Sequence, residues 1–362
     1  MPQVGIMTFL HNENCGSSLQ ALAMQQTLTA LGWDPLGLDY LPDRAEQVRN
    51  LLRSGNSPAV VIDSLHRKRG HGIRNTAGFN RFNQEWLRLT APAHNRNDLA
   101  RLAEDCEILL AGSDQVWSPE WLNPAYFFDF APQKSKVAYA CSLGVSKDPP
   151  PRKARKLKKL CDGFHSISVR EEGGKAILQK LLPDREIAVM PDPVFLLTRN
   201  EWLEIAGNLQ TISACTAYFI KDNSSYPEKA EKLAREKGLS LLPLAVTPSM
   251  QSLPNAVQNP DPIEWLRYMA SAEHVITDSF HGAAMAAILG KPLTILRRWK
   301  DGDPQSKNSR IDQLKRLLEW TDDTECLPSA EVNERLHKLR EKGRSWLAGA
   351  LEQSLKVSGK RG

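Results

Sequence analysis

Asp278-Ser279-Phe280-His281-Gly282 is the stretch whose residue types most clearly suggest chemistry. The β-branched run 275–277 before it predicts a buried strand, and the small residues from 282 to 290 predict a helix. A helix N-terminus presents free N–H groups and favours anions, and histidine can donate a proton at neutral pH. The turn therefore predicts an anion-binding site. The alternative is that Asp278 or Ser279 only caps the helix while His281 packs nearby.

Three cationic side chains would complete such a site. Arg170 ends the strand-like run 166–169, Lys291 follows the helix, and Arg310 follows a polar stretch at 303–309. Two guanidinium groups and a helix N-terminus can hold a small dianion through charge-assisted hydrogen bonds. We therefore expect these three cations near the anion. A surface ion pair is the alternative role for each arginine.

A second group of polar residues lies in the first half of the chain, where turns follow apolar strand-like runs. The group comprises Asn12, Asn14, Gly16, Asp114, Gln115 and Trp117. Short polar groups at such turns can bond to sugar hydroxyls, and Trp117 can stack on the apolar face of a sugar. The alternative is that Asp114 caps a turn and Trp117 belongs to the core.

The alternation of strand-like and helical patterns predicts how these turns are positioned. Strand-like runs and helical patterns alternate from residue 4 to about 197, and a second such series follows. We expect an α/β fold of two Rossmann-like domains facing a cleft, 1–197 on the acceptor side with Arg170 and 198–362 on the donor side with His281. This prediction allows the final helix to pack back on the first domain. GxGxxG is absent, which disfavours a dinucleotide site.

Composition limits the remaining classes. The 362 residues carry 47 basic and 42 acidic side chains, a net charge of +5, which is too mild to indicate nucleic-acid binding. The six cysteines have no CxxC spacing, so neither a zinc site nor a disulfide framework is expected. No apolar run approaches the length of a membrane span, and the first strand begins directly after Met1. A cytoplasmic protein is expected, and association with the inner face of the membrane through its basic segments is left open.

The chain resembles the polysaccharide pyruvyl transferases. The resemblance rests on ordered segments from residue 4 to about 320: 7–9 with 14–23, 112–117 with 126–130, 168–171, 192–197 and 277–282. It implies a GT-B-like pair of Rossmann domains with phosphoenolpyruvate as donor and no cofactor. The product it implies is a pyruvate ketal, usually on two hydroxyls of a hexose in a bacterial surface glycan or its lipid-linked precursor.

The resemblance also implies roles for single residues. Arg170 and His281 correspond to donor-site residues, with Ser279 and Gly282 beside them. Some family members have an arginine where this chain has Ser279, and Arg310 is the candidate for the missing cation. His281 would deliver a proton to the methylene carbon, and a carboxylate, Asp114 or Asp278, would act as base.

Two other functions remain open at this level. A nucleotide-sugar glycosyltransferase of the same two-domain build is the main alternative, and it requires contacts to a base and a ribose. A binding or assembly protein that kept the fold without catalysis is the other. The acceptor sugar, the ketal stereochemistry and the oligomeric state do not follow from the sequence.

Overall fold

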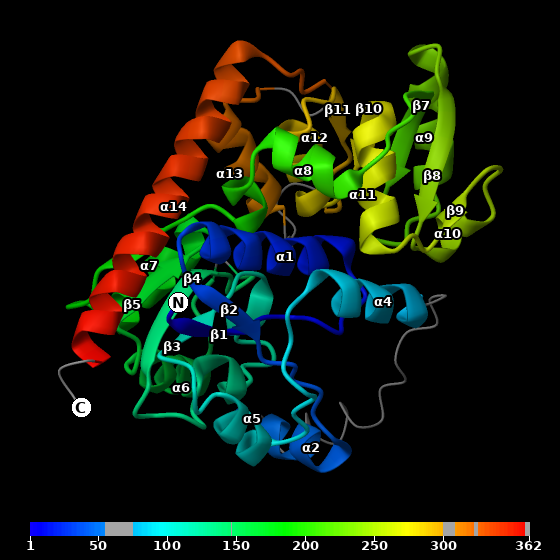
Figure 1. Cartoon of the computed structure of the whole chain (residues 1–362). Helices are drawn as coiled ribbons and strands as arrows, with labels where there is room; N and C mark the ends of the chain where they lie inside the picture. Colours follow the sequence, from blue (N-terminus) through cyan, green and yellow to red (C-terminus); the bar gives the residue numbers. More distant parts are fainter. Residues whose placement is uncertain (55–74, 146, 300–307, 322–324, 359–362) are drawn as a thin grey trace.

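The computed structural model describes residues 1–54, 75–145, 147–299, 308–321 and 325–358 (Figure 1). Two parallel sheets form its framework. The first has six strands in the order β2-β1-β3-β4-β5-β6, and the second has five in the order β11-β10-β7-β8-β9. This confirms the expectation of two Rossmann-like α/β domains.

The first sheet contains β1 (Gln3–Met7), β2 (Asp34–Gly37), β3 (Ile108–Ala111), β4 (Ser135–Cys141), β5 (Ser166–Val169) and β6 (Ile187–Val189). Its helices are α1 (Cys15–Ala30), α2 (Arg44–Arg53), α4 (Thr76–Trp86), α5 (Arg96–Leu102), α6 (Pro151–Cys161) and α7 (Glu172–Leu181), with 3-10 turns η1 (Gln115–Trp117), η2 (Pro124–Phe127) and η3 (Pro193–Leu196). The central strand β3 is buried along its whole length, which explains its uninterrupted apolar run.

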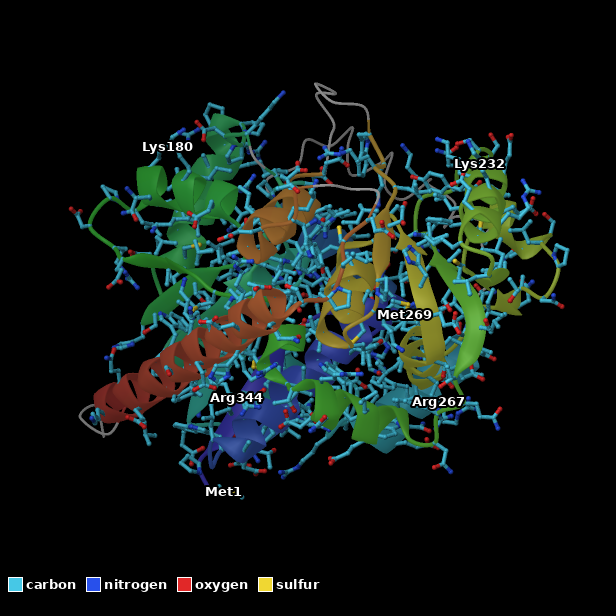
Figure 2. The ribbon with its side chains drawn as sticks, turned by 90° about the horizontal axis from the view of Figure 1, so that it is seen from above. Met1, Lys180, Lys232, Arg267, Met269 and Arg344 are labelled. Atoms are coloured by element: carbon cyan, nitrogen blue, oxygen red, sulfur yellow. The ribbon has the colours of Figure 1, made fainter. Side chains whose placement is uncertain are left out.

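The second sheet contains β7 (Ile212–Tyr218), β8 (Ser240–Ala245), β9 (Val257–Gln258), β10 (Ala272–Thr277) and β11 (Leu293–Ile295). Its helices are α8 (Arg199–Ala206), α9 (Tyr226–Glu236), α10 (Pro248–Gln251), α11 (Pro262–Ser271), α12 (Phe280–Ile288) and α13 (Ser309–Leu318). Figure 2 shows Lys180 of α7 and Lys232 of α9 on opposite sides of the molecule, one in each domain.

The last helix, α14 (Ala330–Ser358), runs from the second domain back along the first sheet (Figure 1). Leu347 and Leu351 are buried in one cluster with Val4 and Ile6 of β1. A Cβ on Gly343 would lie 2.5 Å from the side chains of Leu196 and Tyr139. Only glycine lets the helix approach this closely.

Some local expectations differ from the structure or lie outside the described residues. The Pro-, Ser- and Asn-rich composition of 247–260 predicts a loop, but this stretch contains α10 and the edge strand β9. Pro248 occupies the first turn of α10, where proline is tolerated. The pattern of 59–69 predicts a helix, but this stretch lies outside the described residues, as do positions 303–307 of the polar stretch. No helix in the described part of the chain is long and apolar enough to cross a bilayer.

Candidate active site

A cavity of ≈ 290 Å³ lies between the two domains, where the carboxyl ends of several strands converge. The first domain lines it with Phe9, Asn12, Asn14, Ser17, Asp114, Gln115 and Trp121. The second domain contributes Ile220, Ser279, Phe280, His281, Arg298 and Arg310. Ligands of open α/β sheets bind at this edge, so the cavity is the candidate active site.

The turn before α12 is held by its own hydrogen bonds. Ser279 caps the helix: its hydroxyl accepts from the Gly282 N–H at 3.4 Å. The carboxylate of Asp278 accepts from the backbone N–H groups of Ile220 at 2.9 Å and Lys221 at 3.2 Å. The capping alternative is therefore confirmed for Ser279, whereas Asp278 binds the backbone that follows β7. The cap coexists with a cavity at the same helix end.

Asp278 is wrong as a candidate base. Its side chain is fully buried and is not among the residues that line the cavity. Burial raises the pKa of Asp278 although the charge of Arg298 and the backbone N–H groups lower it. The carboxylate joins β10 to the end of β7, so its role is to hold the turn.

His281 lies between the two domains with 8% of its surface exposed. Its Nε2 is 3.4 Å from Oδ2 of Asp192 at the start of η3. On the other side, a Cβ on Gly16 would lie 2.3 Å from the imidazole ring. The glycine at the start of α1 is therefore required by the position of the histidine.

Asp192 is the centre of a buried network that sequence reasoning did not assign to the site. Its Oδ2 accepts from Arg170 Nη1 at 2.5 Å and from the Ser113 hydroxyl at 3.0 Å, and it faces His281. Burial favours the neutral acid, but the charges of His281 and Arg170 outweigh it and hold the pKa of Asp192 well below its usual range. The sequence signal for Asp192 was its position just beyond the carboxyl end of β6, where ligands of parallel sheets bind.

Arg170 is placed one layer behind the cavity and not in it. It is 3% exposed, donates from Nε to Glu171 at 3.0 Å, and lies 4.9 Å from the centre of the Phe280 ring. It lines a second cavity of ≈ 230 Å³, which shares Phe280 and Arg310 with the first. Nη1 of Arg170 donates to Oδ2 of Asp192, and the same oxygen lies 3.4 Å from Nε2 of His281.

Arg310 lines the cavity beside Gln115. With its amide oxygen turned toward the guanidinium, Gln115 accepts from both terminal nitrogens of Arg310 at 3.0 Å. Burial, followed by the charge of Arg170, lowers the pKa of Arg310 to about 10. The side chain is thus a desolvated cation, which makes it a strong partner for an anion.

Arg298 is a second cation of the cavity, and sequence reasoning missed it. Its Nε donates to the Asp278 carbonyl at 2.8 Å and lies 3.2 Å from the Asp278 carboxylate. It lines the same cavity as Ser279. Arg298 thus supplies positive charge beside the position where Ser279 lacks it. The signal was its location just beyond β11, at the carboxyl edge of the second sheet.

Asp114 is the carboxylate that reaches the cavity from the first domain. It accepts from the Ser17 hydroxyl and, at 2.8 Å, from the Gln115 N–H. Burial raises the pKa of Asp114, but the charges of Arg170 and His281 prevail and keep it below the usual range. Asp114 is therefore an anionic hydrogen-bond acceptor in the site.

Asn12 and Asn14 line the same cavity, at the turn before α1. Asn14 caps α1 by accepting from the Ser17 N–H at 3.1 Å, and Asn12 donates to the Ser17 hydroxyl at 2.9 Å. Ser17, which sequence reasoning did not single out, therefore connects this turn to Asp114.

Besides Asp278 and Arg170, the sequence-predicted site residues Trp117 and Lys291 lie away from the cavity. Trp117 is 0% exposed and stacks on Phe127 in the core of the first domain, so it cannot stack on a sugar. Trp121, which is 38% exposed, lines the cavity instead. Lys291 follows the C-terminal end of α12 and lies near Arg199 and Glu273, so it adds no charge at the N-terminal end of that helix. Among the described residues, no group of three or more His, Cys, Asp and Glu residues is placed to hold a metal ion.

Comparison with known proteins places this site in a family context. The family model for polysaccharide pyruvyl transferase matches residues 14–299, which is most of the chain. No curated protein sequence gives a significant match. A putative UDP-N-acetylglucosamine 2-epimerase from Listeria monocytogenes is similar in structure, with a TM-score of 0.50, 11% identity, and 97% of this chain and 95% of that chain covered.

A second solved structure, UDP-GlcNAc 2-epimerase from Neisseria meningitidis bound to UDP-GlcNAc, has a TM-score of 0.49 and 12% identity, with 98% of this chain and 100% of that chain covered. At such identities the likeness concerns the fold alone.

Proposed function

Because this chain belongs to the polysaccharide pyruvyl transferase family, we propose that it transfers the pyruvyl group of phosphoenolpyruvate to two hydroxyls of a hexose. The acceptor is a bacterial surface polysaccharide or its lipid-linked precursor. The products are a pyruvate ketal and phosphate. One observation carries the proposal: His281, Arg298 and Arg310 converge on a single inter-domain cavity in a chain that matches this family.

The positive charges in the cavity support phosphoenolpyruvate as the donor. Phosphoenolpyruvate carries a phosphate and a carboxylate, and two guanidinium groups lie at the N-terminus of α12. Guanidinium groups and helix N-termini both favour such anions. A cavity of ≈ 290 Å³ is small for a drug-sized ligand and suits a three-carbon donor with the reacting part of a sugar.

The first step adds an acceptor hydroxyl to the enol carbon of the donor. His281 delivers a proton to the methylene carbon, which becomes the methyl group, and the enol carbon acquires cationic character. The hydroxyl then bonds to this carbon and loses its proton to Asp114. Because bonding to a cationic carbon makes the hydroxyl acidic, a carboxylate with a lowered pKa suffices as acceptor.

In the second step, the other hydroxyl displaces phosphate. Its oxygen bonds to the same carbon, the carbon–oxygen bond to phosphate breaks, and the proton leaves with the phosphate. The cations Arg298 and Arg310 stabilise the departing anion. The methyl group thus carries a proton from His281, and the proton of the first hydroxyl is on Asp114. Return of that proton from Asp114 to His281 through solvent restores both residues, and no oxidant or reductant is needed.

Phosphate release from phosphoenolpyruvate tests this function directly. The wild-type protein is mixed with the donor and a panel of neutral hexose oligosaccharides and lipid-linked glycans, and the ketal methyl group is followed by NMR. We expect release that depends on both substrates and is lost in His281→Asn. Absence of both donor binding and turnover across the panel would overturn the proposal. A thermal shift with UDP-glucose, and none with phosphoenolpyruvate, would favour a nucleotide-sugar glycosyltransferase.

A further inference from the structure

A third cavity, of ≈ 900 Å³, adjoins the candidate active site and is larger than it. Phe9, Asn12, Asn14 and Ile220 line both cavities, so the two lie side by side. Both domains contribute to the larger one, since Tyr126 and Tyr218 both line it. A donor of three carbons leaves this space unused, and the acceptor must reach the small cavity from somewhere.

Aromatic side chains line the two neighbouring cavities. The rings of Phe9 and Tyr126 meet edge to face at 5.3 Å, and the ring of Tyr40 lies 6.3 Å from that of Tyr126. Trp121 stands at the small cavity, where its indole N–H donates to the Gln115 carbonyl at 3.2 Å. Rigid aromatic faces of this kind bind the apolar faces of sugar rings.

The charges of the two cavities differ in sign. Glu13 and Asp222 line the larger cavity, and no lysine or arginine is among its described lining residues. The small cavity, in contrast, contains Arg298 and Arg310, whose two positive charges exceed the one negative charge of Asp114. Such a field attracts an anionic donor to one end and repels anionic groups from the other.

Hydrogen-bonding groups suited to hydroxyls complete the larger cavity. His11 lines it and pairs with Asp39 at 2.5 Å, and Gln47 and Asn259 line it too. Neutral amides and an imidazole–carboxylate pair can donate to or accept from sugar hydroxyls. Among the described residues that line the larger cavity, none is a lysine or arginine that would compensate the charge of a uronate or a phosphate.

We propose that the larger cavity is the acceptor site and that its ligand is an oligosaccharide of uncharged sugars. The proposal rests on the proposed function, because it assigns the small cavity to the donor. The sugar to be modified lies against Trp121 and Phe9, and the following sugars continue past Tyr126 and Tyr40. Selectivity against hexuronic-acid chains arises from Glu13 and Asp222.

Saturation-transfer NMR on the wild-type protein tests ligand class and length. The probes are a hexose, a neutral hexose tetrasaccharide and a hexuronic-acid tetrasaccharide of the same linkage. We expect the neutral tetrasaccharide to bind about 10-fold more tightly than either of the others. Equal or tighter binding of the hexuronic-acid chain would overturn the charge assignment. Equal binding of the single hexose would overturn the extended site.

Variants at Trp121 test the stacking contact. Trp121→Ala should weaken the neutral tetrasaccharide about 10-fold, whereas Trp121→Phe, which keeps an aromatic face, should lose about 3-fold or less. Leu209→Ala is the control, because Leu209 is similarly exposed and lines neither cavity. Circular dichroism checks that each variant is folded. Unchanged binding in a folded Trp121→Ala protein would overturn the placement of the acceptor.

A charge reversal tests selectivity independently of stacking. Asp222→Lys should raise the affinity for the hexuronic-acid tetrasaccharide several-fold, and Asp105→Lys, a reversal outside the cavity, should not. Equal gains in both variants would show that only the net charge matters and would overturn the assignment to this cavity. Calorimetry of phosphoenolpyruvate with the wild-type protein separates the two proposals. Donor binding without the glycan preference refutes only the acceptor site, and absent donor binding refutes the proposed function.

Discussion

Oδ2 of Asp192 lies 3.4 Å from Nε2 of His281, although the two residues belong to different domains. The carboxylate starts η3 after the first sheet, and the histidine is in the first turn of α12 after β10. Docking of the domains therefore assembles the pair. Asp192 does not line the candidate active site and acts as a positioning residue, which holds the imidazole.

Asp192→Asn should lower turnover about 100-fold while changing donor affinity less. The amide keeps the size of the side chain but removes the negative charge that faces Nε2 of His281 and pairs with Arg170. Ser113→Ala, which removes a hydrogen bond to the same carboxylate but keeps its charge, is the control. Phosphate release measures the turnover of both variants, and calorimetry measures their affinity for phosphoenolpyruvate. Equal losses of turnover in the two variants would contradict the role of the charge.

Acid should destabilise the protein partly through the same carboxylate. The pKa of Asp192 is lowered in the folded state because His281 and Arg170 outweigh the effect of burial. Its contribution is therefore complete above the ordinary aspartate pKa of about 3.9 and is lost as pH falls toward the folded value. Between about pH 5 and pH 3, urea unfolding should show a steeper loss of stability for the wild type than for Asp192→Asn. Parallel curves would contradict the prediction.

Arg298→Ala and Arg310→Ala should each weaken phosphoenolpyruvate binding by about 10- to 100-fold, because a charge-assisted hydrogen bond is worth about 1.5–3 kcal/mol. Arg297→Ala is a matched control, since the neighbouring arginine pairs with Asp312 at 3.0 Å and does not line the cavity. Calorimetry at low and moderate salt measures the affinities. A loss of equal size in the control would indicate that net charge, and not contact, determines binding.

Gly16→Ala should abolish turnover without unfolding the protein. The added Cβ would lie 2.3 Å from the imidazole of His281, so the ring or the start of α1 must move. Gly349→Ala, in α14, has no atom within 4 Å of the added Cβ. It should raise the free energy of unfolding by about 0.5–1 kcal/mol, because alanine favours helices over glycine. Phosphate release and thermal unfolding distinguish the two. An active Gly16→Ala protein would contradict the contact.

The local sequence pattern was sufficient for most helices and strands and for the part of the site at the start of α12. The β-branched run before Asp278 and the small residues after Gly282 predict β10 and α12, because strand and helix periodicities are local properties. The repeated alternation predicts two parallel sheets for the same reason. His281 follows from that pattern, since it sits at the N-terminus of the helix that the pattern defines.

The tertiary structure alone decided which side chains meet. Asp192 is distant from His281 in sequence, and only the docking of the two domains brings them together. Arg298 reaches the same helix end because β11 pairs with β10 in the second sheet. Trp117 and Trp121 follow the same glycine turn, and packing against Phe127 buries the first and leaves the second at the cavity. Contacts of this kind depend on the direction of each side chain and on the approach of remote elements, which no local periodicity contains.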